Sequence, residues 1–138
     1  MRVLALDVGD SRVGLAISDP TGLLASPLGH VDRSPTDVQD IIQTAKENKA
    51  ATIVVGLPLT LSGESRTQAG KVRQFIRELR SSTDIPVQTM DERLSTVQAQ
   101  RLLTDSDRGQ GRRSSRDRGR IDSSAAAVIL QGYLDSRR

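Results

Sequence analysis

The sequence contains no cysteine and almost no aromatic residues, and these absences exclude several kinds of site. Without cysteine, the 138-residue chain has no disulfides, no thiolate zinc sites and no cysteine nucleophile. Phe75 and Tyr133 are its only aromatic side chains. Because base-stacking platforms need aromatic faces, a chain of this composition would have to bind nucleic acid mostly through the sugar–phosphate backbone.

Long apolar runs are also missing. No run approaches the ~18 residues that a membrane span requires, and the chain opens directly into the apolar segment 1–6 without the pattern of a signal peptide. We therefore expect a soluble, cytoplasmic protein with no membrane partner. The length suits one domain over residues 1–138, which would bury roughly two thirds of its unfolded surface.

Positive charge is present but unevenly distributed. The net charge is only +3, yet 17 of the 20 basic residues are arginine. Six of them lie within 13 residues, opposed only by Asp117: Arg108, Arg112, Arg113, Arg116, Arg118 and Arg120. Clustered guanidinium groups suit phosphate, because each can donate two hydrogen bonds at once. Residues 104–120 contain no apolar side chain, so we expect a flexible, Arg-rich loop, for which a plain solvated loop is the alternative.

The hydrophobic pattern changes its period along the chain and predicts both strands and helices. Short apolar or alternating runs predict strands over 1–6, 12–18, 23–31, 51–55 and 85–90. Apolar residues at helical spacing predict helices over 34–48, 65–79, 95–103 and 121–132, the first three with Ser34, Ser65 and Ser95 as N-caps.

The order of these elements predicts an α/β fold. Turns alone separate the first three strands, which favours an antiparallel meander, whereas helices link the later strands, which favours parallel crossovers. We therefore expect a five-stranded mixed sheet, with three antiparallel and then two parallel strands, flanked by helices on both faces. Pro27 and Pro86 favour edge or strand-start positions, because proline cannot donate to the ladder.

Three carboxylates from distant segments are expected at one edge of this sheet. In parallel α/β sheets, sites form at the carboxyl ends of the strands. Asp7 ends the first strand, Glu92 follows the strand over 85–90, and Asp122 opens the last helix. Converging carboxylates repel one another unless a counter-charge is present, and Mg²⁺ or Mn²⁺ would supply it. Two such ions can drive phosphodiester cleavage, although each residue taken alone also fits a turn, ion-pair or helix-capping role.

The loop after the strand over 51–55 is a second candidate for contact with the substrate. It leaves a central strand at the same end as Asp7 and carries the hydroxyls of Thr60 and Ser62. Those hydroxyls could donate hydrogen bonds to a phosphate, next to the expected N-terminus of a helix. An ordinary capped connection is the alternative for this loop.

Four motifs, in order along the whole chain, resemble the YqgF/RuvX family, the pre-16S rRNA nucleases also described as Holliday junction resolvase-like. They lie at 6–19 (LDVGDSRVGLAISD), 55–58 (VGLP), 91–96 (DERLST) and 122–126 (DSSAA). The run 91–96 is the most specific of them. The resemblance implies a ribonuclease H-like fold and a metal-dependent phosphodiesterase with Asp7, Glu92 and Asp122 as its acidic triad.

The same resemblance implies a role in maturing the 5′ end of precursor 16S rRNA, with the small-subunit precursor as a partner. Arg12 and Arg93 are further candidates for contacting the substrate. Family members often carry lysine just before the last aspartate, where this chain has Arg118 and Arg120. Arginine keeps the charge but cannot act as a proton donor.

Other functions compete with this interpretation. Branched DNA offers the same phosphate backbone as structured RNA, so a junction-resolving endonuclease fits the residues equally well. A catalytically silent RNA-binding module is a third possibility, although carboxylates repel phosphate unless a metal is present. The Asp-x-Gly opening at Asp7 also resembles the phosphate hairpin of ATPases that clamp ATP between two domains, but we expect a single domain here, and the sequence shows no second hairpin and no adenosine motif.

Overall fold

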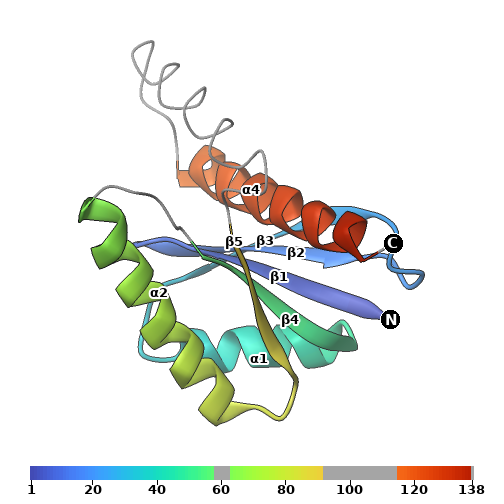
Figure 1. Ribbon diagram of the computed structural model, residues 1–138, viewed down its shortest axis with the longest axis horizontal. Coiled ribbons are helices and arrows are strands. Elements are labelled where there is room, and N and C mark those ends of the chain that lie inside the picture. The colour runs from blue at the N-terminus through green and yellow to red at the C-terminus, as the bar shows by residue number, and fades with distance from the viewer. Residues whose placement is uncertain (58–62, 92–114, 138) are drawn as a thin grey trace.

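The computed structural model describes residues 1–57, 63–91 and 115–137, and they form a five-stranded mixed sheet covered by helices (Figure 1). The strands are β1 (Arg2–Val8), β2 (Arg12–Ser18), β3 (Ala25–Asp32), β4 (Ala50–Leu57) and β5 (Val87–Asp91). The sheet order is β3-β2-β1-β4-β5. β1 pairs antiparallel with β2, and β2 with β3, whereas β4 runs parallel to both β1 and β5. The predicted fold class is confirmed.

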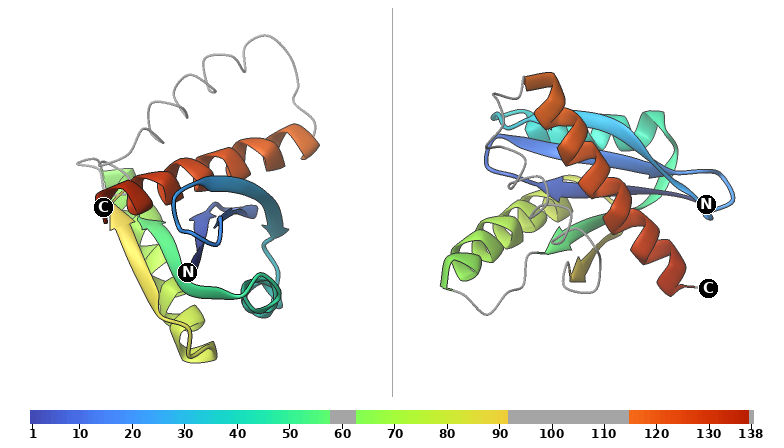
Figure 2. Two further views of the ribbon diagram at one scale, coloured as in Figure 1. Left: turned by 90° about the vertical axis from the view of Figure 1, so that its right-hand side faces the viewer. Right: turned by 90° about the horizontal axis from the view of Figure 1, so that it is seen from above.

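Helices cover both faces of the sheet, as the sequence predicted. α1 (Asp37–Glu47) and α2 (Gly63–Ser82) lie on one face, and α4 (Ser115–Ser136) crosses the other obliquely (Figure 2). In the described segments, no helix is both long enough and apolar enough to cross a membrane. The helix predicted over 95–103 lies outside the described residues.

β1 is central and buried on both faces, which explains its continuous apolar run. Leu4, Leu6 and Val8 belong to the core under α1 and α2, whereas Val3 and Ala5 belong to the core under α4. Successive side chains of a strand point to opposite faces. The same alternation directs the side chain of Asp7 to the α4 face.

β3 is an edge strand, as Pro27 indicated. Its pairing with β2 shifts between Ala16–Pro27 and Leu15–Gly29, so Leu28 is an extra residue that bulges out of the ladder. Gly29 has a φ of 121°, which side-chain-bearing residues rarely adopt. The bulge therefore depends on glycine at this position.

Two helices begin earlier than the sequence predicted, and one begins later. α4 begins at Ser115, so residues 115–120 are helical and that part of the expected loop over 104–120 is wrong; residues 104–114 lie outside the description. Once the apolar stripe after Ile121 has nucleated a helix, extension through arginine-rich turns costs little. α2 likewise begins at Gly63, which places Ser65 inside the helix rather than at its N-cap.

α1 begins three residues after the predicted N-cap. The hydroxyl of Ser34 accepts a hydrogen bond from the Thr36 amide (3.2 Å), and the Asp37 amide donates to the Ser34 carbonyl (3.2 Å). These contacts close a turn instead of starting the helix, which begins at Asp37.

Candidate active site

Asp7 lies at the carboxyl end of the central strand and is 4% exposed. β4 and β5 run parallel to β1, so their carboxyl ends meet at the same edge of the sheet. The register places Asp91, the last residue of β5, beside Leu57 at the end of β4. Glu92 is the next residue in the chain, but it lies outside the described residues. The ends of three strands therefore converge around Asp7.

The first half of α4 extends over this same edge. Gln131, in the second half of α4, accepts a hydrogen bond from the Ala25 amide (3.0 Å) and donates one to the Leu23 carbonyl (3.1 Å). Ala25 pairs with Ser18, next to the start of β1, so the second half of α4 is fixed at the amino end of β1. From Gln131 back to its first residue, α4 extends toward the carboxyl end of β1 (Figures 1 and 2). Its first half includes Asp122, whose backbone alone is described.

Glycine flanks Asp7 on both neighbouring strands. Gly14 of β2 is its direct partner, and Gly56 of β4 follows the Leu6–Val55 pair as Asp7 does. Neither glycine projects a side chain over the carboxylate. In the next strand His30 pairs with Gly14, so Asp7 and His30 face the same side of the sheet with no side chain from β2 between them.

Arg12, predicted to contact the substrate, lies on the same face as Gly14, because the two are separated by two positions in β2. Its Nε is 3.8 Å from Asp32 Oδ1, and the same oxygen is 3.5 Å from His30 Nε2. The structure thus places one predicted arginine near the end of the sheet that carries Asp7.

For the remaining predicted site residues, the structure describes no side chains. Thr60, Ser62, Arg93, Arg112 and Arg113 lie outside the described residues. The three other arginines lie in the first turns of α4, where the backbone alone is described: Arg116, Arg118 and Arg120. Among the side chains that are described, no group of three or more His, Cys, Asp or Glu could hold a metal ion. Since Glu92 and Asp122 are not in that set, the acidic triad stays a prediction.

The β1–β2 turn, residues 9–11, follows Asp7 directly and is tightly closed. The Gly9 amide donates to the Arg12 carbonyl at 2.8 Å, and a Cβ added at Gly9 would lie 2.9 Å from that same oxygen. Any residue larger than glycine would therefore force the turn open.

Arg33, which the sequence did not single out, also holds this turn. Its Nη1 donates to the Gly9 carbonyl (3.0 Å), and its backbone amide donates to the Ser11 carbonyl (3.0 Å). Its Nε donates to Asp37 Oδ2 at 2.9 Å. Only the four-residue spacing to Asp37 was visible in the sequence, and that spacing alone suggests an ordinary ion pair.

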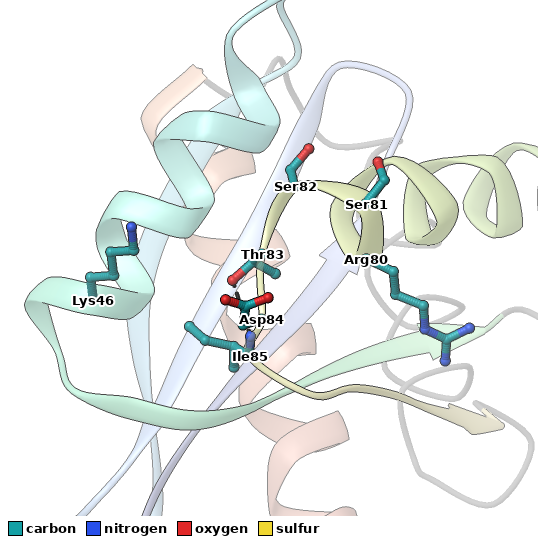
Figure 3. Close-up of a pocket in the computed structure, with 7 residues that line it drawn as sticks. All are labelled: Lys46, Arg80, Ser81, Ser82, Thr83, Asp84 and Ile85. Carbon is teal, nitrogen blue, oxygen red and sulfur yellow. Dashed lines mark hydrogen bonds between the residues drawn. The ribbon is translucent and has the colours of Figure 1, made fainter.

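A hollow of about 390 Å³ lies at the other end of the sheet, where α1 and α2 end and β5 begins (Figure 3). The carbonyl groups at the two helix ends bring partial negative charge to it. None of the residues that line it was predicted to act in catalysis. The lining residues are Lys46, Arg80, Ser81, Ser82, Thr83, Asp84 and Ile85.

Comparison of the sequence with known families gives a match over almost the whole chain. Residues 1–136 match the model of the family described as "RuvX: Holliday junction resolvase". Curated relatives named "Putative pre-16S rRNA nuclease" include proteins of Roseiflexus sp. (strain RS-1) and Desulforamulus reducens, which are 46% and 42% identical to this chain. The alignments cover 99% of this chain in both cases, and 96% and 98% of the relatives.

Solved structures share the fold at low sequence identity. T. thermophilus RuvC in complex with a Holliday junction substrate has a TM-score of 0.58 and 17% identity, over 99% of this chain and 96% of that one. Fowlpox virus resolvase in complex with Holliday junction DNA has a TM-score of 0.56 and 11% identity, over 99% of each chain. These similarities support a ribonuclease H-like arrangement of the sheet and helices.

Proposed function

The chain belongs to the RuvX family, and we propose that it is a divalent-metal-dependent nuclease that matures the 5′ end of precursor 16S rRNA. One observation carries the proposal. A buried carboxylate, Asp7, lies at the carboxyl end of the central strand, at the edge where β5 and the first half of α4 converge. Glu92 and Asp122 belong to those two converging segments by sequence.

The residues present fit a hard divalent cation. Asp7 offers carboxylate oxygens between two glycine positions, and oxygen is the ligand that Mg²⁺ and Mn²⁺ prefer. Asp7, Glu92 and Asp122 would hold the metal, and we expect two ions at the site. Bound divalent ions supply activation of a water molecule and charge stabilisation of the leaving oxygen.

The protein's own part in this reaction is to position groups and to supply charge. Asp7 is fixed between paired strands, so its carboxylate is already placed before substrate arrives. Arg12 lies on the same face and is a candidate for binding the phosphates beside the scissile bond, together with Arg93 and the arginines of 112–120. Thr60 and Ser62 would donate hydrogen bonds to the same backbone.

The substrate we favour is structured RNA of the small-subunit precursor. The curated relatives are named for precursor 16S rRNA, and the scarcity of aromatic residues favours recognition of backbone and shape. Branched DNA is the second candidate, because the two solved structures with this fold were determined with Holliday junctions. A silent RNA-binding module is less favoured, because a buried carboxylate at the binding edge repels phosphate.

Substitution of Asp7 tests the mechanism. Asp7→Asn keeps the size of the side chain but removes the charge that the metal requires. Loss of an outer-shell partner in a metal site costs about 10–100-fold, so loss of a direct ligand is expected to lower cleavage by more than about 100-fold. Cleavage of a precursor 16S 5′-end fragment in Mg²⁺ or Mn²⁺, run beside a four-way DNA junction, measures the effect and separates the two substrates.

Asp84→Asn is the matched control, because Asp84 is an exposed carboxylate at the opposite end of the sheet. It should cleave at the wild-type rate. Circular dichroism should show that both variants are folded. Full activity of folded Asp7→Asn would overturn the metal mechanism, and preferential cutting of the junction would replace the RNA substrate with DNA.

A further inference from the structure

Arg33 contacts two segments that are far from it in the sequence, the β1–β2 turn and α2, as well as the nearby start of α1. Beside its contacts with Gly9, Ser11 and Asp37, its guanidinium carbon lies 5.2 Å from the centre of the Phe75 ring. The side chain therefore connects the β1–β2 turn to both α1 and α2. The contact with Phe75 lies on the side of the sheet opposite α4, because Phe75 belongs to the core under α1 and α2.

The partners of Arg33 are themselves fixed. Asp37 is 6% exposed, and its carboxylate also accepts hydrogen bonds from the amides of Ser34 (3.3 Å) and Val38 (2.7 Å). Phe75 is 2% exposed. The planar guanidinium lies against the ring while Nε and Nη1 donate in two directions. Arg33 is thus held at a single orientation with respect to the turn.

Holding the Gly9 carbonyl fixes the peptide plane between Gly9 and Asp10. In a trans peptide, the carbonyl and the following amide point in opposite directions, and no cis peptide occurs in the described residues. The Asp10 amide therefore faces away from Arg33. A second contact with the turn, Lys71 Nζ to Asp10 Oδ1, is 3.7 Å long and joins two exposed side chains, so it restrains the turn far less.

We propose that Arg33 is a positioning residue, which fixes the β1–β2 turn and thereby the end of β1 that presents Asp7. The inference rests on the proposed nuclease function. Asp7 precedes Gly9 by two residues, and Gly14, its direct partner, lies two residues beyond Arg12, where the turn closes. An error in the turn would therefore be transmitted to Asp7 through both strands of the hairpin.

The test compares Arg33→Gln and Arg33→Lys with Arg80→Gln. Arg80 is a matched control because it is also an arginine that donates to a backbone carbonyl, that of Val87, through Nε (3.3 Å) and Nη2 (2.8 Å). It lies at the opposite end of the sheet, beside the hollow of Figure 3. Backbone amide NMR spectra of residues 8–12 report the turn, and steady-state cleavage of the precursor RNA fragment gives kcat and KM.

In Arg33→Gln we expect the amide signals of residues 9–11 to move, with kcat lowered about 10–100-fold and KM changed less than about twofold. Arg33→Lys keeps the charge near Asp37 but lacks the planar fork, so kcat should recover in part. Arg80→Gln should keep the wild-type kcat and the wild-type signals of residues 9–11. If Arg33→Gln does not fold, Arg33→Lys carries the comparison.

Unchanged signals at residues 9–11, or equal kcat values in the Arg33 and Arg80 variants, would overturn the positioning role. A rise in KM of about 10–100-fold in Arg33→Gln, without loss of kcat, would overturn it too, since that result indicates a role in substrate binding. If the wild-type protein cleaves none of the substrates, the nuclease function fails, and the NMR comparison alone decides whether Arg33 fixes the turn.

Discussion

Lys49 adopts a backbone conformation that suits glycine better than lysine. Its φ is 55°, directly after Asn48, the residue that caps α1. A left-handed conformation costs a residue with a Cβ about 1–2 kcal/mol, and glycine avoids this cost but loses about 0.5–1 kcal/mol through its freer unfolded state. Lys49→Gly should therefore raise the free energy of unfolding by about 0.5–1 kcal/mol. Urea unfolding measures this difference, and a destabilised variant would contradict the prediction.

Asp19 stabilises the loop between β2 and β3 only while it is ionised. Hydrogen bonds from the Leu24 amide, the Thr21 hydroxyl and the Leu23 amide hold the pKa of the Asp19 carboxyl far below its usual range. Because the pKa is lower in the folded than in the unfolded state, the contribution is complete above the unfolded pKa of about 3.9. It is then lost as the pH falls further toward the folded value.

Asp19→Asn should therefore lower the free energy of unfolding at pH 7, and the difference from the wild-type protein should become smaller below about pH 4. Urea unfolding of both proteins from pH 2.5 to 7 measures this difference. Between pH 5 and 7 the two stability curves should run parallel, because Asp19 stays ionised in both states. A difference that stays constant from pH 2.5 to 7 would show that folding does not lower the pKa of Asp19, and would contradict the prediction.

α4 holds the second core of the protein together. Leu130 is fully buried on it, against the face of the sheet that carries Val3, Ala5 and Val54. Leu130→Ala should lower the free energy of unfolding by about 2–5 kcal/mol, through lost burial and the cavity left behind. Val128→Ala, at a half-buried position of the same helix, should cost less than about 1 kcal/mol. Equal costs in urea unfolding would mean that α4 is not packed as described.

The elements that the sequence predicted well are those whose apolar residues carry their own period. In α1, the four residues at helical spacing are all buried: Val38, Ile41, Ile42 and Ala45. The start of α4 was missed because residues 115–120 contain no apolar side chain, so no helical period of apolar residues can be seen there. The bulge at Leu28 was missed for a related reason, since pairing with β2 decides it and β3 alone does not.

The candidate site, too, was predicted from the sequence only in part. The position of Asp7 at the end of a buried strand followed from the apolar run before it and from the rule that sites form at strand ends. Arg33 could not be found in this way. Its contacts with Gly9 and Phe75 join segments separated by 24 and 42 residues, and folding alone brings them together.

Over the surface as a whole, the proposed function requires positive charge at the α4 side of the sheet. Replacing Arg112, Arg113 and Arg116 with alanine should weaken RNA binding and reduce the slope of log K against log salt by roughly two units, because each arginine that neutralises a phosphate contributes somewhat under one. Filter binding at a series of increasing salt concentrations measures the slope. Thermal stability should barely change.

A second triple variant controls for net charge. Lys46, Arg73 and Arg77 are exposed on α1 and α2, so their replacement by alanine also removes three positive charges, from helices that lie on the face of the sheet away from α4. Its slope should stay close to that of the wild-type protein. Equal slopes in the two triple variants would show that RNA responds to total charge and that residues 112–116 have no special part in binding.

The place of α4 in the chain has a consequence for how the protein is made. On the ribosome, the five described strands are all synthesised before α4, so the apolar face formed by Val3, Ala5, Ala16 and Val54 cannot be covered by α4 until this helix emerges. Asp122 arrives on that same helix. With the proposed mechanism, a chain without α4 lacks both the helix that packs on its second core and one of its three carboxylates. Cleavage would therefore begin only after α4 has been made, so chains at an earlier stage of synthesis would not cut RNA beside the ribosome that makes them.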